Sequence, residues 1–162
     1  MECKNIIHRV VAIVILCMGF MMANVVSAQT TYKTVNNKTY VFDNNKKVIY
    51  NQAHKSKASQ FFATEGFNIN NPSIVSKTFK QILSADRRKE LKKERLAVVF
   101  ECNRNGKIES VKFLFTTTPF LTATEVEQLE KAFLNQSFTV TSNLGKDQDI
   151  KFAIPCFFSK IQ

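Results

Sequence analysis

The segment from Leu96 to Phe115 constrains the fold most, because two apolar stretches flank an Asn-Gly pair. Its sequence is LAVVFECNRNGKIESVKFLF. Asn-Gly between alternating apolar residues is the strongest short-range signal for a β-hairpin, since both residues tolerate the positive φ of a tight turn. The segment therefore predicts two antiparallel strands that are joined by Asn105 and Gly106.

With a two-residue turn, the register of this hairpin is counted outward from Arg104 opposite Lys107. Side chains alternate between the two faces of a sheet with a period of two. One face then holds only apolar side chains, in the facing pairs Phe100–Val111, Val98–Phe113 and Leu96–Phe115. The other face pairs Glu101 with Ser110, Val99 with Lys112, and Ala97 with Leu114. Turn and hydrophobic pattern specify the same register, which predicts a hairpin at the centre of the fold.

Residues 1–28 have the layout of a signal peptide. Lys4 and Arg9 precede an apolar run over 10–22, and Ser27 and Ala28 supply small residues for cleavage. We expect cleavage after Ala28, so that the mature protein is periplasmic or secreted and does not span a membrane. One alternative is retention as an anchor, since apolar residues continue to position 26. A lipoprotein cut before Cys17 is disfavoured, because Leu16 stands where a small residue is needed.

The remaining chain, 29–162, is expected to form a single α+β domain with three parts. Residues 29–70 contain an N-terminal β-hairpin around Asn36-Asn37, followed by a loop. Residues 71–95 are expected to be helical, with Asn71 as N-cap and Pro72 at the first helical position. Ser84 either lies within one long helix or caps a second one. Residues 96–162 form a β-β-α-β core.

The helix of this core is predicted over 122–135. Thr122 and Glu125 match a capping box, and Leu121 and Val126 match its hydrophobic staple. The expected buried stripe is Val126, Leu129 and Phe133, and the expected polar face includes Glu127 and Glu130. A final strand is predicted over 150–158, because its apolar side chains alternate.

This connectivity predicts a small antiparallel sheet of strand order 2-1-3, packed on helices. Because the helix returns the chain across the sheet, the third strand runs antiparallel to the first and pairs beside it. Pro155 favours an edge position for that strand, since proline lacks a ladder donor. Cys102 and Cys156 then lie at opposite ends of neighbouring strands, too far apart for a disulfide, so two free thiols are predicted.

The segment 96–158 resembles the C-terminal domain of TonB, the envelope energy transducer. The resemblance rests on the order of LAVVFEC, RNGKI, a helix with Leu129 and Ala132, Phe138, Asn143-Leu144-Gly145 and IKFAIPCFF. It implies an exposed sheet edge that captures a short peptide, here at Ile150, Lys151, Phe152, Ala153 and Ile154. The chain lacks the Pro-rich linker of TonB and the proline usual after the aromatic near Phe138. It looks more like a small exported protein of unknown function from a Gram-negative, Bacteroides-type bacterium.

The chain has a formal net charge of +10. An exported protein does not meet a genome, so this charge favours an anionic envelope surface or an acidic partner over nucleic acid. The candidate basic face comprises Arg87, Arg88, Lys89, Lys92 and Lys93. The alternative is a solvated helix, since Asp86, Glu90 and Glu94 alternate with these cations.

The sequence offers little catalytic chemistry. His54 lies in a polar stretch and is expected to be a surface residue, because no nucleophile or orienting acid is signalled beside it. We predict no catalytic residue, metal site or cofactor. The favoured function is a non-enzymatic module that binds an envelope protein or peptide at the exposed sheet edge. The alternatives are a small envelope hydrolase and an accessory or inhibitor subunit.

Overall fold

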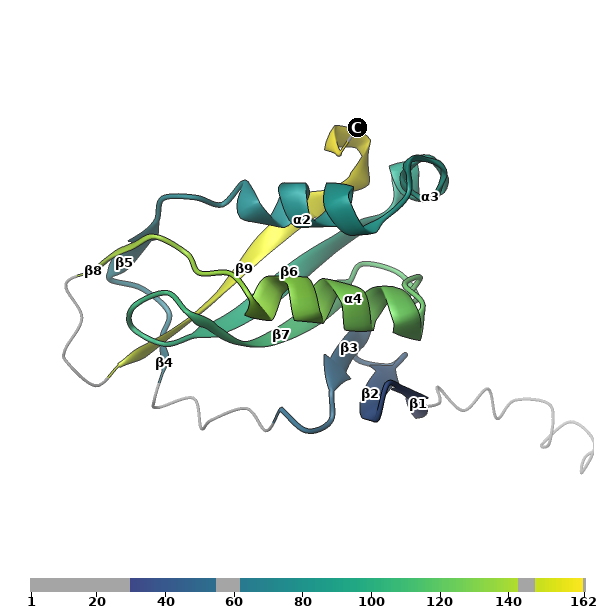
Figure 1. Cartoon of the computed structure of the whole chain (residues 1–162), viewed down its shortest axis with the longest axis horizontal. Coiled ribbons are helices and arrows are strands. Elements are labelled where there is room, and N and C mark those ends of the chain that lie inside the picture. The colour runs from purple at the N-terminus through teal and green to yellow at the C-terminus, as the bar shows by residue number, and fades with distance from the viewer. Residues whose placement is uncertain (1–29, 55–61, 143–147, 162) are drawn as a thin grey trace, which may run out of the picture.

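The computed structural model describes residues 30–54, 62–142 and 148–161, which form an α+β fold (Figure 1). The strands are β1 (Thr30–Val35), β2 (Lys38–Asp43), β3 (Val48–Asn51), β4 (Phe62–Ala63), β5 (Phe67–Ile69), β6 (Arg95–Cys102), β7 (Ile108–Phe115), β8 (Val140–Ser142) and β9 (Asp149–Phe157). The helices are α2 (Ile74–Ile82), α3 (Ala85–Glu90) and α4 (Ala123–Leu134), with short 3-10 turns η2 (Leu91–Lys93) and η3 (Phe158–Lys160).

Seven strands form one sheet in the order β1-β2-β3-β7-β6-β9-β4, and β5 pairs separately with β8. Neighbours in the large sheet run antiparallel except β9 and β4. Strands β7, β6 and β9 have the predicted order, but the prediction of a small three-stranded sheet is wrong. The sheet is larger because residues 48–50 of β3 pair with β7, so the N-terminal strands extend the sheet.

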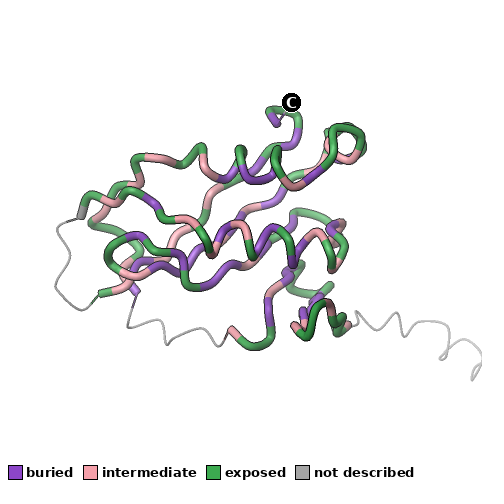
Figure 2. The backbone as a smooth tube through the Cα atoms, viewed as in Figure 1, coloured by how far each residue is buried: buried purple, intermediate pink, exposed green. Residues whose placement is uncertain are grey.

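Helices α2 and α4 cover one face of the sheet, and the core lies between them and the strands (Figures 1 and 2). Phe79 of α2 and Phe133 of α4 meet with ring centroids 6.1 Å apart. Phe79 also contacts Phe113 of β7, and Phe133 contacts Phe100 of β6. All four rings are buried. The core face predicted for the hairpin is confirmed, since its six apolar side chains are all buried.

The predicted hairpin register is confirmed for all six pairs, although the turn differs from the prediction. The Asn103 N–H donates to the Lys107 carbonyl at 2.9 Å, so the loop has three residues instead of two. In β7, Glu109 is an extra residue, because Ile108 and Ser110 pair with consecutive residues of β6. The β-bulge at Glu109 compensates for the longer loop and restores the register that a two-residue turn would give.

Gly106 is required at the end of this loop for two reasons. Its φ of +82° lies in the left-handed region that favours glycine. A Cβ atom at this position would lie 2.0 Å from the Phe138 carbonyl oxygen. The Phe138 N–H donates to the Gly106 carbonyl at 2.8 Å, so the chain after α4 is fastened to the tip of the hairpin.

The first helix begins later than predicted. Ser73, not Asn71, is the N-cap residue of α2. The Asn71 side chain instead accepts a hydrogen bond from the Thr139 N–H and donates one to the Ser137 carbonyl. Ser84 caps α3, so a second helix starts there and the alternative of one long helix is excluded.

The capping box of Thr122 and Glu125 in α4 is confirmed, with both of its hydrogen bonds present. The expected polar face is wrong in part, because Glu127 is only 8% exposed and Glu130 only 1%. Strands β1–β3 extend the sheet beneath this helix, and α4 contacts β1. This extension of the sheet therefore explains two wrong predictions, the three-stranded sheet and the exposure of Glu127 and Glu130.

The two thiols are free and buried, as predicted. Cys102 lies opposite Ile150 and Cys156 opposite Leu96, at the two ends of the β6–β9 ladder. Burial raises the pKa of each thiol to about 12. Both cysteines are therefore protonated and unreactive at neutral pH.

Candidate functional site

The long strand nearest one edge of the sheet is β9. Its inner side pairs with β6 along 150–157, whereas β4 pairs only with Asp149 and Ile150 on its outer side. Ile150 is thus buried between two strands, although the sequence placed it on the exposed edge. Within the described ranges, no strand covers the outer side of 151–157, which includes the other four predicted edge residues.

Alternation across the sheet identifies the main-chain groups of β9 that face outward. The Phe115 N–H points away from β6, because it donates to the Lys47 carbonyl beside β3 at 2.8 Å. Leu96 lies opposite Phe115, so the main-chain groups of Leu96 face β9. Because Leu96 pairs with Cys156, the main-chain groups of the even-numbered residues of β9 face β6 and those of the odd-numbered residues face outward. Pro155 agrees, since proline is tolerated in a sheet where its missing N–H would face away from the partner strand. Lys151 and Ala153 therefore offer outward N–H and carbonyl groups.

A groove of about 310 Å³ lies beside the second half of β9. The N-terminal turn of α2 forms one wall, and β9 with η3 forms the other. Its lining includes Pro72, Val75, Ile154, Pro155, Phe157 and Lys160. Among the described lining residues Lys160 alone is charged, so the groove suits apolar side chains next to an unpaired strand. No sequence pattern pointed to the α2 wall, because only the tertiary fold brings 72–76 to β9.

Cations flank this edge. Phe157 is 37% exposed, and its ring lies between the Arg95 guanidinium, 5.6 Å away, and the Lys160 ammonium, 5.3 Å away. Further along β9, the Lys151 ammonium lies 2.9 Å from a carboxylate oxygen of Glu101. The edge is therefore basic near Phe157, whereas the Lys151 charge is paired with Glu101.

The predicted basic face is partly used inside the protein. The Arg87 guanidinium donates to Glu125 at 2.7 Å, to Glu90 and to the Phe120 carbonyl, and the bond to Glu125 raises its pKa most. Arg88 donates to two carbonyls at the end of α2. These two arginines thus join α3 to α4 and α2.

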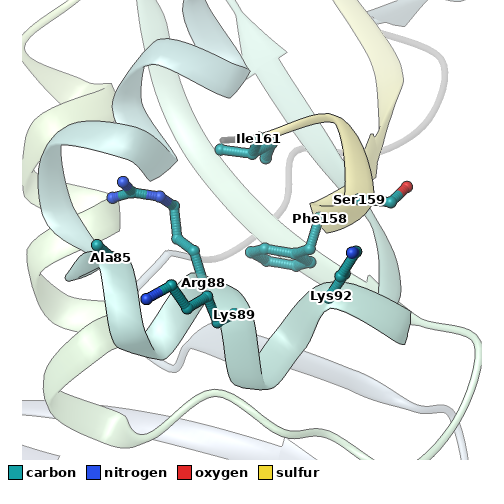
Figure 3. Close-up of a pocket in the computed structure, with 7 residues that line it drawn as sticks. All are labelled: Ala85, Arg88, Lys89, Lys92, Phe158, Ser159 and Ile161. Carbon is teal, nitrogen blue, oxygen red and sulfur yellow. The ribbon is translucent and has the colours of Figure 1, made fainter.

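The three lysines of this face remain accessible. Lys92 and Lys93 are exposed, and Lys89 has only a solvent-exposed ion pair with Asp86 at 3.3 Å. Lys89 and Lys92 line a second groove together with Arg88, as Figure 3 shows. We call it the cationic groove. The structure brings Lys93 to neither groove.

A buried polar cluster occupies the opposite end of the sheet, and we call it the Glu130 cluster. One carboxylate oxygen of Glu130 accepts hydrogen bonds from Tyr40 at 2.8 Å, Asn51 at 3.1 Å and Lys38 at 3.2 Å. The other oxygen lies 3.2 Å from His54 Nδ1. His54 was expected to be an isolated surface residue, but its side chain is only 28% exposed and contacts Glu130.

The cluster fastens β2 and β3 to α4. Burial first, and the Glu130 carboxylate second, raise the pKa of Tyr40, so its hydroxyl remains a hydrogen-bond donor. A buried carboxylate needs such partners, because desolvation without them is costly. No sequence signal identified the cluster, since its members come from three separate segments.

The described residues offer neither a metal site nor a membrane-spanning helix. They contain no group of three or more His, Cys, Asp or Glu side chains placed to hold a metal ion. None of the described helices has the length and apolar character needed to cross a membrane.

Comparison with known proteins identifies the fold. No protein-family model and no curated protein matches the chain. A solved structure does match it. That structure is a DUF5043 family protein from Bacteroides uniformis, with a TM-score of 0.57 and 17% identity over 80% of this chain and 84% of the other. At this identity the likeness shows a shared fold alone, and that family is one of unknown function. The finer resemblance to the C-terminal domain of TonB is not confirmed.

Proposed function

We propose that this protein is an exported, non-enzymatic binding module that captures an extended segment of an envelope protein at the outer edge of β9. The observation that carries the proposal is the stretch 151–157, which no described strand covers and which has the apolar groove beside it. Unpaired main-chain groups supply affinity in strand addition, and neighbouring pockets supply specificity.

The charges around the edge specify the kind of segment. Arg95 and Lys160 lie beside Phe157 at this edge, and the described lining of the groove has no carboxylate. We therefore expect a segment with apolar side chains for the groove and acidic residues for these cations. Pro155 removes one outward donor, so pairing is expected at 151–153 and the groove contacts at 154–157.

Proline substitutions on the two sheet edges test this proposal. Lys151→Pro with Ala153→Pro removes two outward donors of β9 and, by the same alternation, leaves the β6 ladder intact. The matched control is Tyr32→Pro with Thr34→Pro on β1. Thr39 of β2 directs its carbonyl toward the β3 side, so the amide of its partner Thr34 faces outward from β1, and so does the amide of Tyr32 two residues earlier.

The probes are acidic decapeptides selected from a displayed library for binding to the wild-type protein, and thermal unfolding checks that each variant is folded. We expect the β9 variant to bind them at least about tenfold more weakly, a loss comparable to one or two hydrogen bonds, and the β1 variant to bind them normally. Equal binding by both variants, or loss of binding only in the β1 variant, would exclude the β9 edge.

A further inference from the structure

The cationic groove lies between α3, η2 and η3, and it shares Ile161 with the groove beside β9 (Figure 3). Its volume is about 310 Å³, near the lower end of the range for small-molecule sites. The groove is lined by Ala85, Arg88, Lys89, Lys92, Phe158 and Ile161, among others. It is therefore large enough for a slender ligand.

The floor of the groove is apolar and rigid. Phe158 is 2% exposed and Ile161 is 5% exposed. The Phe158 ring is held edge-on by Phe79 at 5.3 Å and by Phe120 at 5.8 Å. Because these two side chains are nearly fully buried, a hydrocarbon chain would contact only their outer edges, together with Ala85 and the apolar stems of the basic lining residues, and this contact requires no rearrangement of the core.

The walls of the groove are cationic. Three of the lining side chains are Arg88, Lys89 and Lys92, and no described lining residue is acidic. The Arg88 guanidinium already donates to the Lys80 and Leu83 carbonyls, so it contributes charge and an apolar stem. Lys92 has no carboxylate partner among the described residues, which leaves its ammonium group available for an anion.

We propose that the cationic groove binds a single-chain anionic amphiphile of the fatty-acid class. The hydrocarbon chain lies along the apolar lining, and the carboxylate pairs with the Lys92 ammonium, while Lys89 adds positive charge on the other side of the Phe158 ring (Figure 3). An anion whose chain excludes water gains more from these cations than it would on an open surface. A two-chain phospholipid would exceed the volume of the groove, so a single chain is the ligand that fits.

Titration with dodecanoate below its micelle concentration tests this assignment on the full chain, with NMR shifts or calorimetry as the readout. Lys89→Glu with Lys92→Glu should weaken binding at least about tenfold, since two attractions become repulsions. The matched control is Lys46→Glu with Lys131→Glu, which has the same net charge as the groove variant but changes two exposed lysines elsewhere on the protein. This control should bind dodecanoate as the wild type does. Ala85→Phe places a ring in the groove and should also abolish binding, whereas dodecanol should bind more weakly than dodecanoate.

Three outcomes would overturn the proposal: no saturable binding of dodecanoate, equal loss in the two charge-reversed variants, or binding to anionic vesicles without binding to monomeric dodecanoate. The last outcome would indicate a membrane surface site. Peptide binding at β9 is measured with different variants, so either proposal can fail while the other stands.

Discussion

At the β1 end of the sheet, polar side chains fasten the strands to α4, whereas at the β9 end apolar side chains join β9 to β6, and β9 also contacts α2. The Glu130 cluster satisfies one buried carboxylate oxygen with three donors from β2 and β3. The β9 end packs Ile150 and Cys156 into the core and stacks Phe152 near Phe100 and Phe138. The end with the polar cluster has these buried side chains engaged internally, and the outer side of β1 has no groove described beside it, whereas the apolar end has two grooves near its unpaired strand. The two ends should therefore respond differently to substitution and to pH.

Glu130→Ala is expected to have the largest effect on stability. It leaves Tyr40, Asn51 and Lys38 without their shared acceptor, and because each buried donor left unpaired costs about 1–3 kcal/mol, we expect a loss of about 2–5 kcal/mol. Urea unfolding measures this loss. Lys131→Ala, on the exposed side of the same helix, is the control and should change the free energy of unfolding by less than about 0.5 kcal/mol. A loss below 1 kcal/mol for Glu130→Ala, roughly the value of one ordinary hydrogen bond, would show that the cluster does not hold this end.

Tyr40→Phe removes one of the three donors and keeps the ring in the core. Because the acceptor is charged, we expect a loss of about 2 kcal/mol. The same unfolding experiment measures it, and a double variant with Glu130→Ala should lose little more than Glu130→Ala alone. Simple addition of the two losses would contradict a shared network.

The β9 end should respond to alkaline pH. Burial raises the pKa of Cys102 and Cys156 to about 12, above their ordinary value of 9.0. Above pH 9 the unfolded chain loses these protons while the folded chain keeps them, so the free energy of unfolding falls as pH rises. At pH 10 each thiol should lower it by about 1 kcal/mol. The free energy of unfolding of Cys156→Ala should therefore fall less between pH 8 and pH 10 than that of the wild type. An equal fall in both proteins would show that the Cys156 thiol does not cause the pH dependence.

Lys38→Ala should have the smallest effect. The Lys38 side chain is 37% exposed, so its pair with Glu130 is screened by water. We expect a loss below about 1 kcal/mol in urea unfolding, and a smaller one at high salt. A loss as large as that of Tyr40→Phe would mean that the ion pair, and not the buried hydrogen bonds, fastens β2 to α4.

The local parts of the fold could be predicted from the sequence. The hairpin register followed from alternation and turn chemistry, and the cap of α4 from Thr122 and Glu125. The joining of β3 to β7 could not be predicted, because any of several strand edges could accept the N-terminal strands. That one pairing decides the burial of Glu130 and the place of His54, so those assignments failed with it.

The candidate site divides in the same way. The order β7-β6-β9 followed from connectivity, and with it the edge position of Lys151 to Ile154. Both grooves depend on where α2 and α3 lie against η3, which no periodicity specifies. The internal use of Arg87 and Arg88 is likewise set by carbonyl and carboxylate groups that lie far away in the sequence.

The short ladder between β3 and β7 has a consequence for motion within the native state. Only three residue pairs join the N-terminal strands to the rest of the sheet. Because this ladder is short, we expect strands β1 to β3 to open from β7 as a cooperative unit before the hairpin of β6 and β7 unfolds. The free energy of that local opening includes the burial of Tyr40, Phe42 and Ile49 in the core as well as the hydrogen bonds to Glu130, and amide hydrogen exchange in β2 and β3 would report it directly.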